Sequence, residues 1–287
     1  MVPGQIRNAL DASGDTTEVQ SVDPFMQAET VTSYRITTNQ SSYFIKWNHD
    51  GPDGLIHAEQ NGLLLLRNHA GVPTPDIFPQ TAESEVLVMS WVKGKSDHTT
   101  PERLGQALAK LHAATDPLYG LNFNNFIGVI PQENKQHASW TNFFRNQRLE
   151  FQSNLMDKSG WSTPARLRML DKIMGKLDQW IDEKTIKPSL LHGDFWSGNW
   201  VVGPGGEPYW IDPSPAFGDS EYDLAFSELF GGFPPKMYGA YREIRPLRPG
   251  YEDRRYIYQL YFLLVHLNIF GESYGPQIDR ILRRFGE

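Results

Sequence analysis

The sequence of 287 residues contains no cysteine. Disulfide bonds, thiolate metal sites, thiol nucleophiles and thiol-based regulation are therefore all excluded. A surplus of positive charge is missing as well, because 27 Lys and Arg stand against 34 Asp and Glu and the net charge is −7. Binding along a nucleic acid depends on a basic surface. We therefore expect no nucleic-acid partner.

Long hydrophobic runs and export signals are also missing. The most apolar stretch, residues 256–270, is interrupted by Gln259, His266 and Asn268, and it is shorter than the roughly 20 residues that a membrane span needs. The first residues show neither a charged segment followed by an apolar run nor a cleavage pattern. These absences predict a cytoplasmic protein without a membrane partner.

What is present is the composition of a globular protein, with 39% hydrophobic and 13% aromatic residues. Alternation of apolar and polar residues predicts strands between residues 19 and 88. One helix, predicted at 56–69, interrupts them, and Gly71 followed by Pro73 ends it. The chain therefore begins with a small sheet that includes one helix.

After residue 89 the pattern becomes helical. Thr100, Pro101 and Glu102 predict an N-cap, a first-turn proline and a first-turn acid. Further helices are predicted at 140–154, 164–184 and 253–270. The predicted fold class is α+β, with an N-terminal β-sheet lobe at residues 1–89 and a larger, mostly helical C-terminal lobe at residues 90–287.

The densest chemical signal is a group of three polar residues. Asp194 and Asn199 are five residues apart, the spacing of the catalytic Asp and the metal-binding Asn in kinase catalytic loops, and Asp212 follows 13 residues later. A hairpin of strands at 200–202 and 209–211 would return Asp212 to Asn199. Oxygen ligands of this kind suit Mg²⁺, which substrate phosphates then help to coordinate. We therefore expect Asn199 and Asp212 to hold Mg²⁺.

Asp194 lies upstream and free of the metal. As the catalytic base it would accept the proton of an attacking hydroxyl and orient that hydroxyl in line with a γ-phosphate. The alternative is that His192-Gly193-Asp194 is only a tight turn and that Asp194 caps a helix.

Two more groups are candidates for nucleotide binding. Lys46 ends a predicted strand, and Glu59 follows 13 residues later on the predicted helix, where it can pair with the lysine and aim it at phosphates. The chain passes between the lobes at Met89, Ser90, Trp91 and Val92. We expect the backbone of these residues to hydrogen-bond an adenine edge. An exposed lysine, a solvated glutamate and an ordinary core strand are the alternatives for these positions.

With these residues in view, the sequence resembles the fructosamine kinase (ketosamine 3-kinase) family, a branch of the protein-kinase-like and aminoglycoside-phosphotransferase-like fold. Residues 191–199, LHGDFWSGN, look like the signature of that family, with Phe195 where leucine is usual, and residues 211–213, IDP, resemble its metal-binding Asp-Pro. Further matching segments are 108–112, 126–128, 218–225 and 229–233. The resemblance covers nearly the whole chain.

The resemblance implies a bilobal kinase that uses ATP and Mg²⁺ to phosphorylate a hydroxyl of a ketosamine, such as the fructosamine or ribulosamine adduct of a small amine or of a protein lysine. It also implies that Asp223 anchors the catalytic loop through backbone hydrogen bonds. Trp196 offers an indole that either stacks on the sugar or packs to hold the loop. Asp219 and Glu221 either meet a cationic amine at the mouth of the site or face solvent.

One segment departs from the family pattern. Residues 25–31 lack the glycines of a phosphate loop, and no glycine lies between Gly14 and Gly51. Glycine lets backbone amides approach phosphates, and Glu29 adds negative charge nearby. A looser loop, a phosphate contact from the Thr30 hydroxyl, or weakened catalysis is therefore expected at this segment.

Three alternative functions fit parts of this pattern. One is a phosphotransferase of the same fold that acts on an aminoglycoside, a choline-like alcohol or a sugar. Another is a pseudokinase that binds nucleotide without transfer, which the glycine-free segment favours. The third is a metal-dependent hydrolase that uses His192, Asp194 and Asp212; otherwise His192 is expected to brace the catalytic loop.

Overall fold

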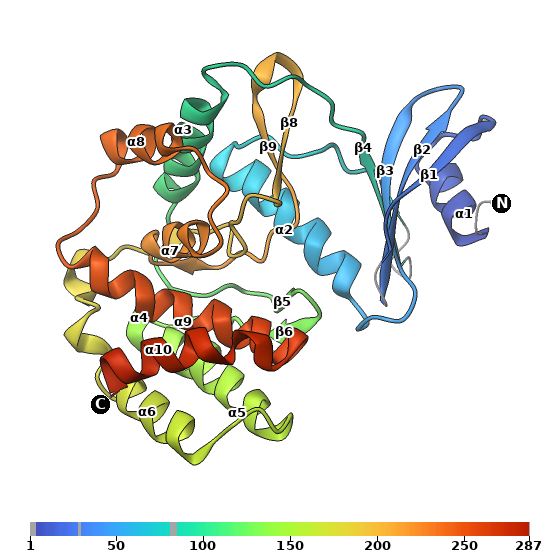
Figure 1. Ribbon diagram of the computed structural model, residues 1–287. Coiled ribbons are helices and arrows are strands. Elements are labelled where there is room, and N and C mark those ends of the chain that lie inside the picture. The colour runs from blue at the N-terminus through green and yellow to red at the C-terminus, as the bar shows by residue number, and fades with distance from the viewer. Residues whose placement is uncertain (1–3, 28–29, 81–84, 287) are drawn as a thin grey trace.

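The computed structural model describes residues 4–27, 30–80 and 85–286 (Figure 1). Its first part is an antiparallel sheet of four strands in the order β1–β2–β3–β4. The strands are β1 (Val19–Gln27), β2 (Val31–Thr38), β3 (Ser42–Asn48) and β4 (Val86–Ser90). The edge position of β1 tolerates Pro24, because an edge strand can lack one backbone donor. The expected N-terminal sheet is confirmed.

Helix α1 (Gly4–Ala12), which the sequence pattern did not reveal, covers one face of this sheet. Ile6 of α1 packs in one apolar cluster with Ile45 of β3. Successive residues of a strand point to opposite faces, so Phe44 and Lys46 lie on the other face. That face turns toward the rest of the chain.

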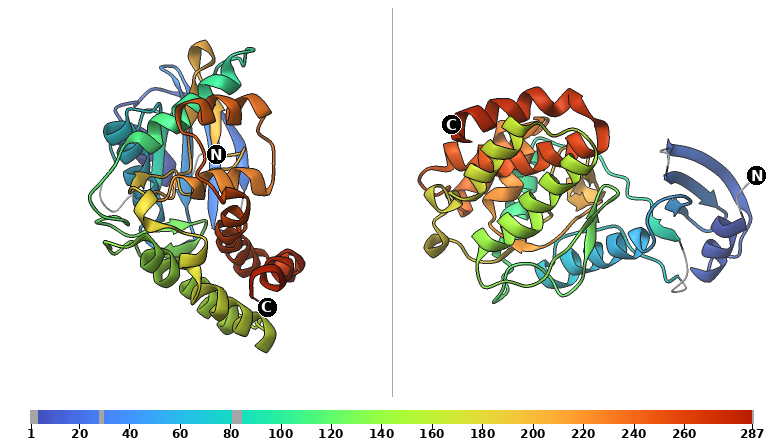
Figure 2. Two further views of the ribbon diagram at one scale, coloured as in Figure 1. Left: turned by 90° about the vertical axis from the view of Figure 1, so that its left-hand side faces the viewer. Right: turned by 90° about the horizontal axis from the view of Figure 1, so that it is seen from below.

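Helix α2 (Leu55–Ala70) connects the sheet to the helical part, as Figure 2 shows in its right-hand view. Its Leu63 packs against Leu87 of β4, whereas Leu66 belongs to the same core as Leu108 in the C-terminal part. The helix expected at 56–69 is confirmed. Helix α2 therefore packs against both the sheet and the helical part. A boundary between lobes near residue 90 separates the sheet from the helical part, but α2 contacts both sides of it.

The rest of the chain is mostly helical. Its helices are α3 (Thr100–Ala113), α4 (Trp140–Phe144), α5 (Phe151–Lys158), α6 (Pro164–Met174), α7 (Glu221–Leu229), α8 (Pro235–Ile244), α9 (Tyr251–Phe270) and α10 (Gly275–Gly286). A π-helical turn, Arg145–Glu150, joins α4 to α5, and 3₁₀ turns lie at Leu177–Gln179, Glu183–Thr185, Pro204–Gly206 and Glu272–Tyr274.

The prediction for the helix at 164–184 needs correction, because this helix ends at Met174. Its pattern misled because the buried Leu170, Ile173, Leu177 and Ile181 keep helical spacing although turns follow the helix.

At the start of α3, Asp97 takes the capping role expected of Thr100. Asp97 Oδ1 accepts the backbone N–H of Thr100 at 3.0 Å. The helices α7, α8 and α10 were not expected.

Helix α9 runs through the main core of the C-terminal part (Figure 1). Phe262 of this helix stacks on Phe226 with ring centres 3.8 Å apart. Trp140 Nε1 donates to the Tyr258 hydroxyl at 2.9 Å, so the polar atoms of these two buried rings are paired. Among the described helices, none is both long and apolar enough to cross a membrane.

Three short strand pairs complete the fold. They are β5 (Asn125–Ile127) with β6 (Ile130–Gln132), β7 (Ser189–Leu190) with β10 (Phe217–Gly218), and β8 (Trp200–Val202) with β9 (Pro208–Trp210). The hairpin β8–β9 confirms the expected pairing of these segments. Asn199 precedes β8 and Asp212 closely follows β9, so the hairpin returns the chain to the point where it began.

Candidate active site

The loop between β7 and β8 presents Asp194 from a tight turn. Gly193 has a φ of 80°, in the left-handed region that favours glycine. A Cβ at this position would overlap the carbonyl oxygen of Ser214. The Ser214 N–H donates in turn to the carbonyl of His192 at 2.8 Å. Glycine is therefore required for the turn.

Asp223, in the first turn of α7, anchors this loop. Its Oδ2 accepts the backbone N–H of His192 at 2.7 Å, and its Oδ1 accepts the N–H of Gly193 at 2.9 Å. The carboxylate is fully buried, and hydrogen bonds in such surroundings are stronger than in water. The structure thus contains the backbone anchoring that the family resemblance implied.

The ring of His192 braces the loop from within. Its Nδ1 accepts the backbone N–H of Asp194 at 3.3 Å, and its Nε2 then carries the proton and donates to the carbonyl of Ile211 at 3.0 Å. Burial lowers the pKa of His192 to about 4, so the ring is neutral at physiological pH. Both nitrogens are used, which leaves none for a metal.

Asp194 itself is held by Asn199. Asn199 Nδ2 donates to Asp194 Oδ2 at 2.6 Å and to the Asp194 carbonyl at 2.8 Å. Burial raises the pKa of Asp194 to about 7, and the hydrogen bond from Asn199 opposes that rise. A carboxylate with a pKa near neutrality is suited to accepting and releasing a proton. The chain enters β8 after this turn rather than a helix, so the helix-cap alternative does not hold.

Lys46, Glu59 and Asp212 meet although they come from three distant segments. Lys46 Nζ donates to Glu59 Oε1 at 2.8 Å and forms an ion pair with Asp212 Oδ1. Asp212 has a φ of 52°, a conformation that residues other than glycine rarely adopt. Backbone strain of this kind is concentrated at functional sites.

The donor set around Asn199 and Asp212 fits Mg²⁺. Because Asn199 Nδ2 points to Asp194 and to the Asp212 carbonyl at 3.4 Å, Asn199 Oδ1 remains as an oxygen donor. Two hard oxygen donors with open positions match a Mg²⁺ site that waters and substrate phosphates complete. Within the described residues no group of three or more His, Asp and Glu side chains could hold a metal. The hydrolase alternative would also need His192, both of whose ring nitrogens are already hydrogen-bonded to the backbone.

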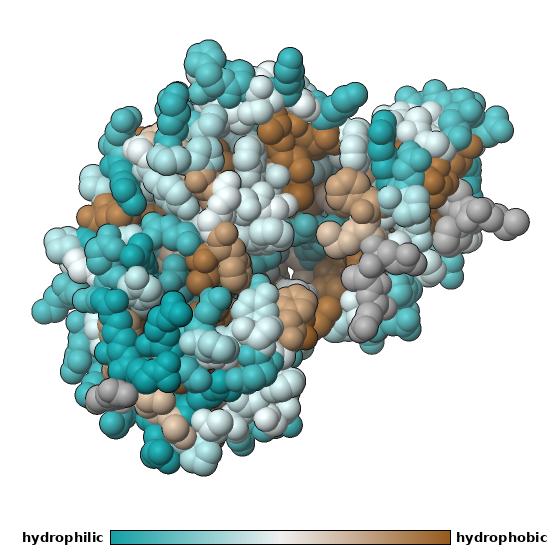
Figure 3. Space-filling model, viewed as in Figure 1, coloured by the Kyte–Doolittle hydropathy of each residue, from teal (hydrophilic) through white to brown (hydrophobic). Residues whose placement is uncertain are grey.

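Exposed aromatic side chains lie beside the catalytic loop. The Trp196 side chain is 40% exposed, and its ring lies against Gly198, where a Cβ would overlap it. A Cβ at Gly232 would likewise overlap the side chain of Ser197. Phe230 lies two residues before Gly232, and its side chain is 43% exposed. Figure 3 shows a hollow between the lobes with hydrophobic residues beside it. Phe230 was missed from the sequence, because the spacing of 229–233 shows a family match but not which side chain is exposed.

The segment expected to meet adenine lies at the junction between the lobes. Met89 is buried in β4, and Ser90, Trp91 and Val92 are partly exposed. The N–H of Ser90 donates to the Asp76 carbonyl at 2.8 Å, and the N–H of Trp91 donates to the Ser42 carbonyl at 3.1 Å. Contacts of these two residues with adenine would therefore involve their carbonyls or side chains.

A group of aromatic rings that the sequence pattern did not reveal covers this junction from the sheet side. Phe25 lies edge-on to Phe44 and Trp91, with ring centres 5.3 and 5.9 Å away, and Arg35 lies 4.9 Å from the ring centre of Trp91. Phe25 is 61% exposed. In the glycine-free segment, Ala28 and Glu29 lie outside the described residues.

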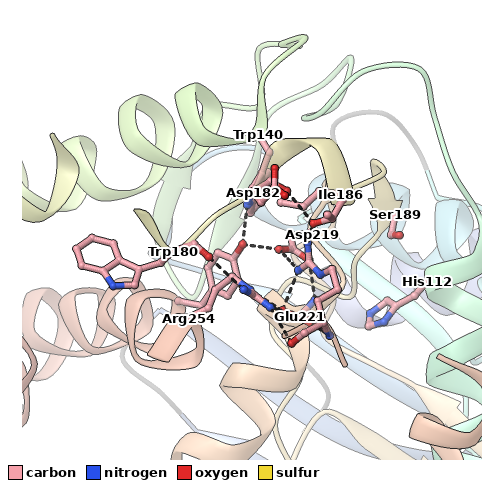
Figure 4. Close-up of polar contacts among 12 residues, drawn as sticks. His112, Trp140, Trp180, Asp182, Ile186, Ser189, Asp219, Glu221 and Arg254 are labelled. Atoms are coloured by element: carbon pink, nitrogen blue, oxygen red, sulfur yellow. Dashed lines mark hydrogen bonds and ion pairs between the residues drawn. The ribbon is translucent and has the colours of Figure 1, made fainter. Parts of the chain in front are cut away.

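The structure corrects the expectation for Asp219 and Glu221. Both carboxylates are buried, rather than exposed at the mouth of the site or in solvent. Arg248 contacts both of them, and Arg254 Nε donates to Glu221 Oε2 at 2.6 Å (Figure 4). A cationic substrate would have to displace an arginine, so these two residues do not belong to the acceptor site.

Comparison with known proteins agrees with this geometry. The family model for fructosamine kinases matches residues 1–286. The chain belongs to the fructosamine kinase family. A protein of Enterococcus faecium that is named a probable ketoamine kinase is 39% identical over 269 residues, which cover 92% of this chain and 95% of that protein.

Solved structures of similar fold give the same result. A protein of Thermobifida fusca that is named a putative fructosamine-3-kinase has a TM-score of 0.86 and 29% identity, and the match covers 96% of this chain and 95% of the other. An ADP-bound aminoglycoside phosphotransferase, APH(2'')-Ib, has a TM-score of 0.60 at 15% identity over 94% of each chain, which shows the shared fold. This member of the family is thus a phosphotransferase of the kinase-like fold, and ATP use follows from its family.

Proposed function

We propose that this fructosamine kinase transfers the γ-phosphate of ATP to a hydroxyl of a ketosamine, with Asp194 as the catalytic base. The observation that supports the proposal most strongly is the convergence of Lys46, Glu59, Asn199 and Asp212 around Asp194. These five side chains are the parts that kinase-like phosphoryl transfer requires.

On the acceptor side, Asp194 orients the reacting hydroxyl and accepts its proton. Asn199 holds the carboxylate from one side, and the His192 ring holds the backbone N–H of the same residue. Correct placement of the hydroxyl matters because phosphoryl transfer depends on an in-line arrangement far more than on the strength of the base.

On the nucleotide side, Lys46 is the cation for the phosphates, and Glu59 aims it. Asn199 Oδ1 and the Asp212 carboxylate would hold Mg²⁺, which neutralises the charge that develops on the transferred phosphoryl group. In the structure Lys46 pairs with Asp212, so arrival of a nucleotide would redirect the ammonium toward phosphate oxygens.

For the acceptor itself, the exposed indole of Trp196, two residues after Asp194, provides a flat apolar face next to the catalytic loop. Such faces stack on sugar rings, and an indole also attracts a cationic amine. A ketosamine carries both a sugar and an amine, so this wall fits it without the carboxylates of Asp219 and Glu221. A ketosamine on a small amine or on a protein lysine would satisfy this chemistry equally. If the enzyme acts on glycated protein, its role would be protein deglycation.

The experiment is a coupled assay of ADP release with one panel of acceptors. The panel contains fructoselysine, ribuloselysine, a glycated peptide, an aminoglycoside, choline and a free sugar. We expect kcat/KM to be highest for one of the ketosamines. Preference for the aminoglycoside, choline or sugar would identify the alternative acceptor class, and stabilisation by Mg·ATP without any transfer would identify a pseudokinase.

Asp194→Asn is the matched variant for this assay. It keeps the shape of the side chain and removes the base, so kcat with the best ketosamine should fall by about 10²–10⁴-fold. Full turnover by Asp194→Asn would refute the assigned role, whichever acceptor is preferred.

A further inference from the structure

A cavity of about 320 Å³ lies behind the catalytic loop and shares no residue with the site just described. It is bounded by the segment before β7, by the junction of β10 with α7, and by the end of α8 with the segment that leads to α9. Its volume is at the lower end of the range for small-molecule sites, about 300–1,000 Å³. The cavity therefore has room for a compact organic ligand.

The floor of the cavity is a buried and fully paired charge network (Figure 4). Arg248 contacts the carboxylates of both Asp219 and Glu221, Arg254 contacts Glu221, and the Tyr258 hydroxyl donates to Asp219 Oδ2 at 2.5 Å. Two carboxylates and two guanidinium groups balance one another. The floor is therefore close to neutral, and its hydrogen bonds fix its shape.

The wall of the cavity carries positive charge that this network does not neutralise. Arg245 and Lys187 line the cavity, and among the described residues neither has a carboxylate within ion-pair distance. The side chain of Arg245 makes a long hydrogen bond of 3.4 Å to Ser189 Oγ. A guanidinium that presents free N–H groups at a cavity is suited to binding a phosphate.

Apolar side chains form the remaining wall. Ile186 and Leu247 line the cavity, and Ile244 at its rim is 55% exposed. An inorganic anion alone would leave this surface uncovered. A phosphate ester with a short carbon skeleton would cover it and place its charge at the two cations.

A chain of buried hydrogen bonds leads from this cavity to the catalytic loop. Asp223 can only accept, so His112 Nε2 donates to its Oδ2 at 3.1 Å, and His112 Nδ1 accepts from the Tyr241 hydroxyl at 2.8 Å. Asp223 holds the backbone of His192 and Gly193.

The chain begins at the wall of the cavity. Tyr241 and Arg245 both line it. Burial raises the pKa of Tyr241, and the positive charge of Arg245 opposes this rise. A change in the position of Arg245 would thus act on Tyr241 directly.

We propose that this cavity binds a small phosphate monoester through Arg245 and Lys187, and that Tyr241, His112 and Asp223 transmit its presence to the catalytic loop. A phosphate that draws Arg245 away from Tyr241 makes Tyr241 a weaker donor to His112, and His112 in turn a weaker donor to Asp223 Oδ2. That oxygen also accepts the backbone N–H of His192, which then binds it more strongly. The backbone anchors at Asp223 then tighten. Tyr241 and His112 are positioning residues in this arrangement.

Binding is tested by calorimetry with glucose 6-phosphate, inorganic phosphate and glucose, in the presence of saturating Mg²⁺ and a non-hydrolysable ATP analogue that fills the nucleotide site. We expect glucose 6-phosphate to bind, inorganic phosphate to bind more weakly and glucose not to bind. Arg245→Gln and Lys187→Gln should each weaken the binding of glucose 6-phosphate at least fivefold.

Two matched variants locate the binding. Arg283→Gln removes an exposed arginine of α10 that has no ion pair within the described residues, and Trp196→Ala alters the acceptor wall; both should bind glucose 6-phosphate like the unaltered protein. The proposal is overturned when the unaltered protein does not bind it at millimolar concentration, or when Trp196→Ala abolishes binding and Arg245→Gln does not.

Hydrogen exchange tests the link to the catalytic loop. Glucose 6-phosphate should slow exchange in peptides that contain residues 191–199 of the unaltered protein. Tyr241→Phe keeps both cations but cannot donate to His112, so it should still bind the ligand and lose the slowed exchange. An unchanged loop in the unaltered protein, or slowed exchange that persists in Tyr241→Phe, would overturn the coupling. None of these measurements requires turnover, so they stand apart from the proposed kinase activity.

Discussion

The two sides of the lobe junction hold their functional groups in different ways. On the helical side, the buried Asp223 fixes the backbone of His192 and Gly193, and Asn199 Nδ2 holds the Asp194 carboxylate. On the sheet side, β1 is an edge strand, and its Phe25 is largely exposed. The difference matches the two roles that we propose, a catalytic base on the helical side and nucleotide binding on the sheet side. A base must be placed to within a fraction of an ångström, whereas the nucleotide must enter and leave.

The largest effect should come from Gly193→Ala. The new Cβ would overlap the Ser214 carbonyl, and alanine resists the φ of 80°. We expect kcat to fall by at least about 10²-fold and the free energy of unfolding to fall by about 2–4 kcal/mol. Steady-state kinetics and urea unfolding measure the two effects.

Gly205→Ala is the control for backbone conformation. Gly205 also has a positive φ, 67°, but a Cβ there would meet nothing within 4 Å. Its substitution should lower the free energy of unfolding by about 1–2 kcal/mol and leave kcat unchanged. Equal losses of kcat in the two variants would show that the catalytic turn is no more constrained than an ordinary surface turn.

Lys46→Met should have the next largest effect. Removal of the ammonium takes away the cation that we assign to the phosphates, while Glu59 and Asp212 lose their shared partner. We expect KM for ATP to rise by about 10–100-fold, with a smaller effect on KM for the acceptor. Kinetics at varied ATP concentration measure this. Lys172→Met, on the exposed side of α6, is the control, and an unchanged KM for ATP in Lys46→Met would contradict the assignment.

Asp15→Asn tests what holds the sheet side together. Burial raises the pKa of Asp15, but hydrogen bonds from Thr17, Thr38 and Tyr43 outweigh it and bring the pKa to about 2. Because this value lies below the ordinary 3.8, the carboxylate stabilises the fold above pH 4, and this stabilisation is lost as the pH falls toward 2. The substitution should therefore lower the free energy of unfolding by about 1–3 kcal/mol at pH 7 and by less at pH 3.

Urea unfolding at the two pH values measures this difference. Asp53→Asn, which removes an exposed carboxylate, should have little effect at either pH. A loss in Asp15→Asn that is as large at pH 3 as at pH 7 would show that shape rather than charge explains it. In either case kcat should change far less than in Gly193→Ala.

The sequence predicts the parts of the site that local spacing determines. Asp194 and Asn199 lie on one turn, and the hairpin β8–β9 returns Asp212 to them. Lys46 and Glu59 are on adjacent elements, so their pairing also follows from the order of strand and helix. Their roles in catalysis remain predictions that the variants above test.

The remaining features depend on contacts between distant segments. Asp219 and Glu221 are acidic residues next to a motif, and nothing local shows that Arg248 and Arg254 bury them. The left-handed φ of Asp212 is equally invisible, because it results from the junction of β9 with the catalytic loop. The sequence shows that a residue is charged, but it does not show which distant residue pairs with that charge in the fold.

The smallest effect should come from Phe25→Ala, which tests the exposed sheet side of the lobe junction. The Phe25 ring contacts Phe44 and Trp91 only edge-on and is 61% exposed. A contact between this exposed ring and a bound nucleotide base would contribute about 0.5–1.5 kcal/mol, so the affinity for a nucleotide should fall only about two- to tenfold, with kcat within twofold. Met26→Ala is the matched control, because Met26 is adjacent and 62% exposed but outside the aromatic group; fluorescence titration with an ATP analogue compares the two. A loss of kcat in Phe25→Ala as large as that in Gly193→Ala would mean that the sheet side is positioned as strictly as the catalytic loop, and the contrast between the two sides would then disappear.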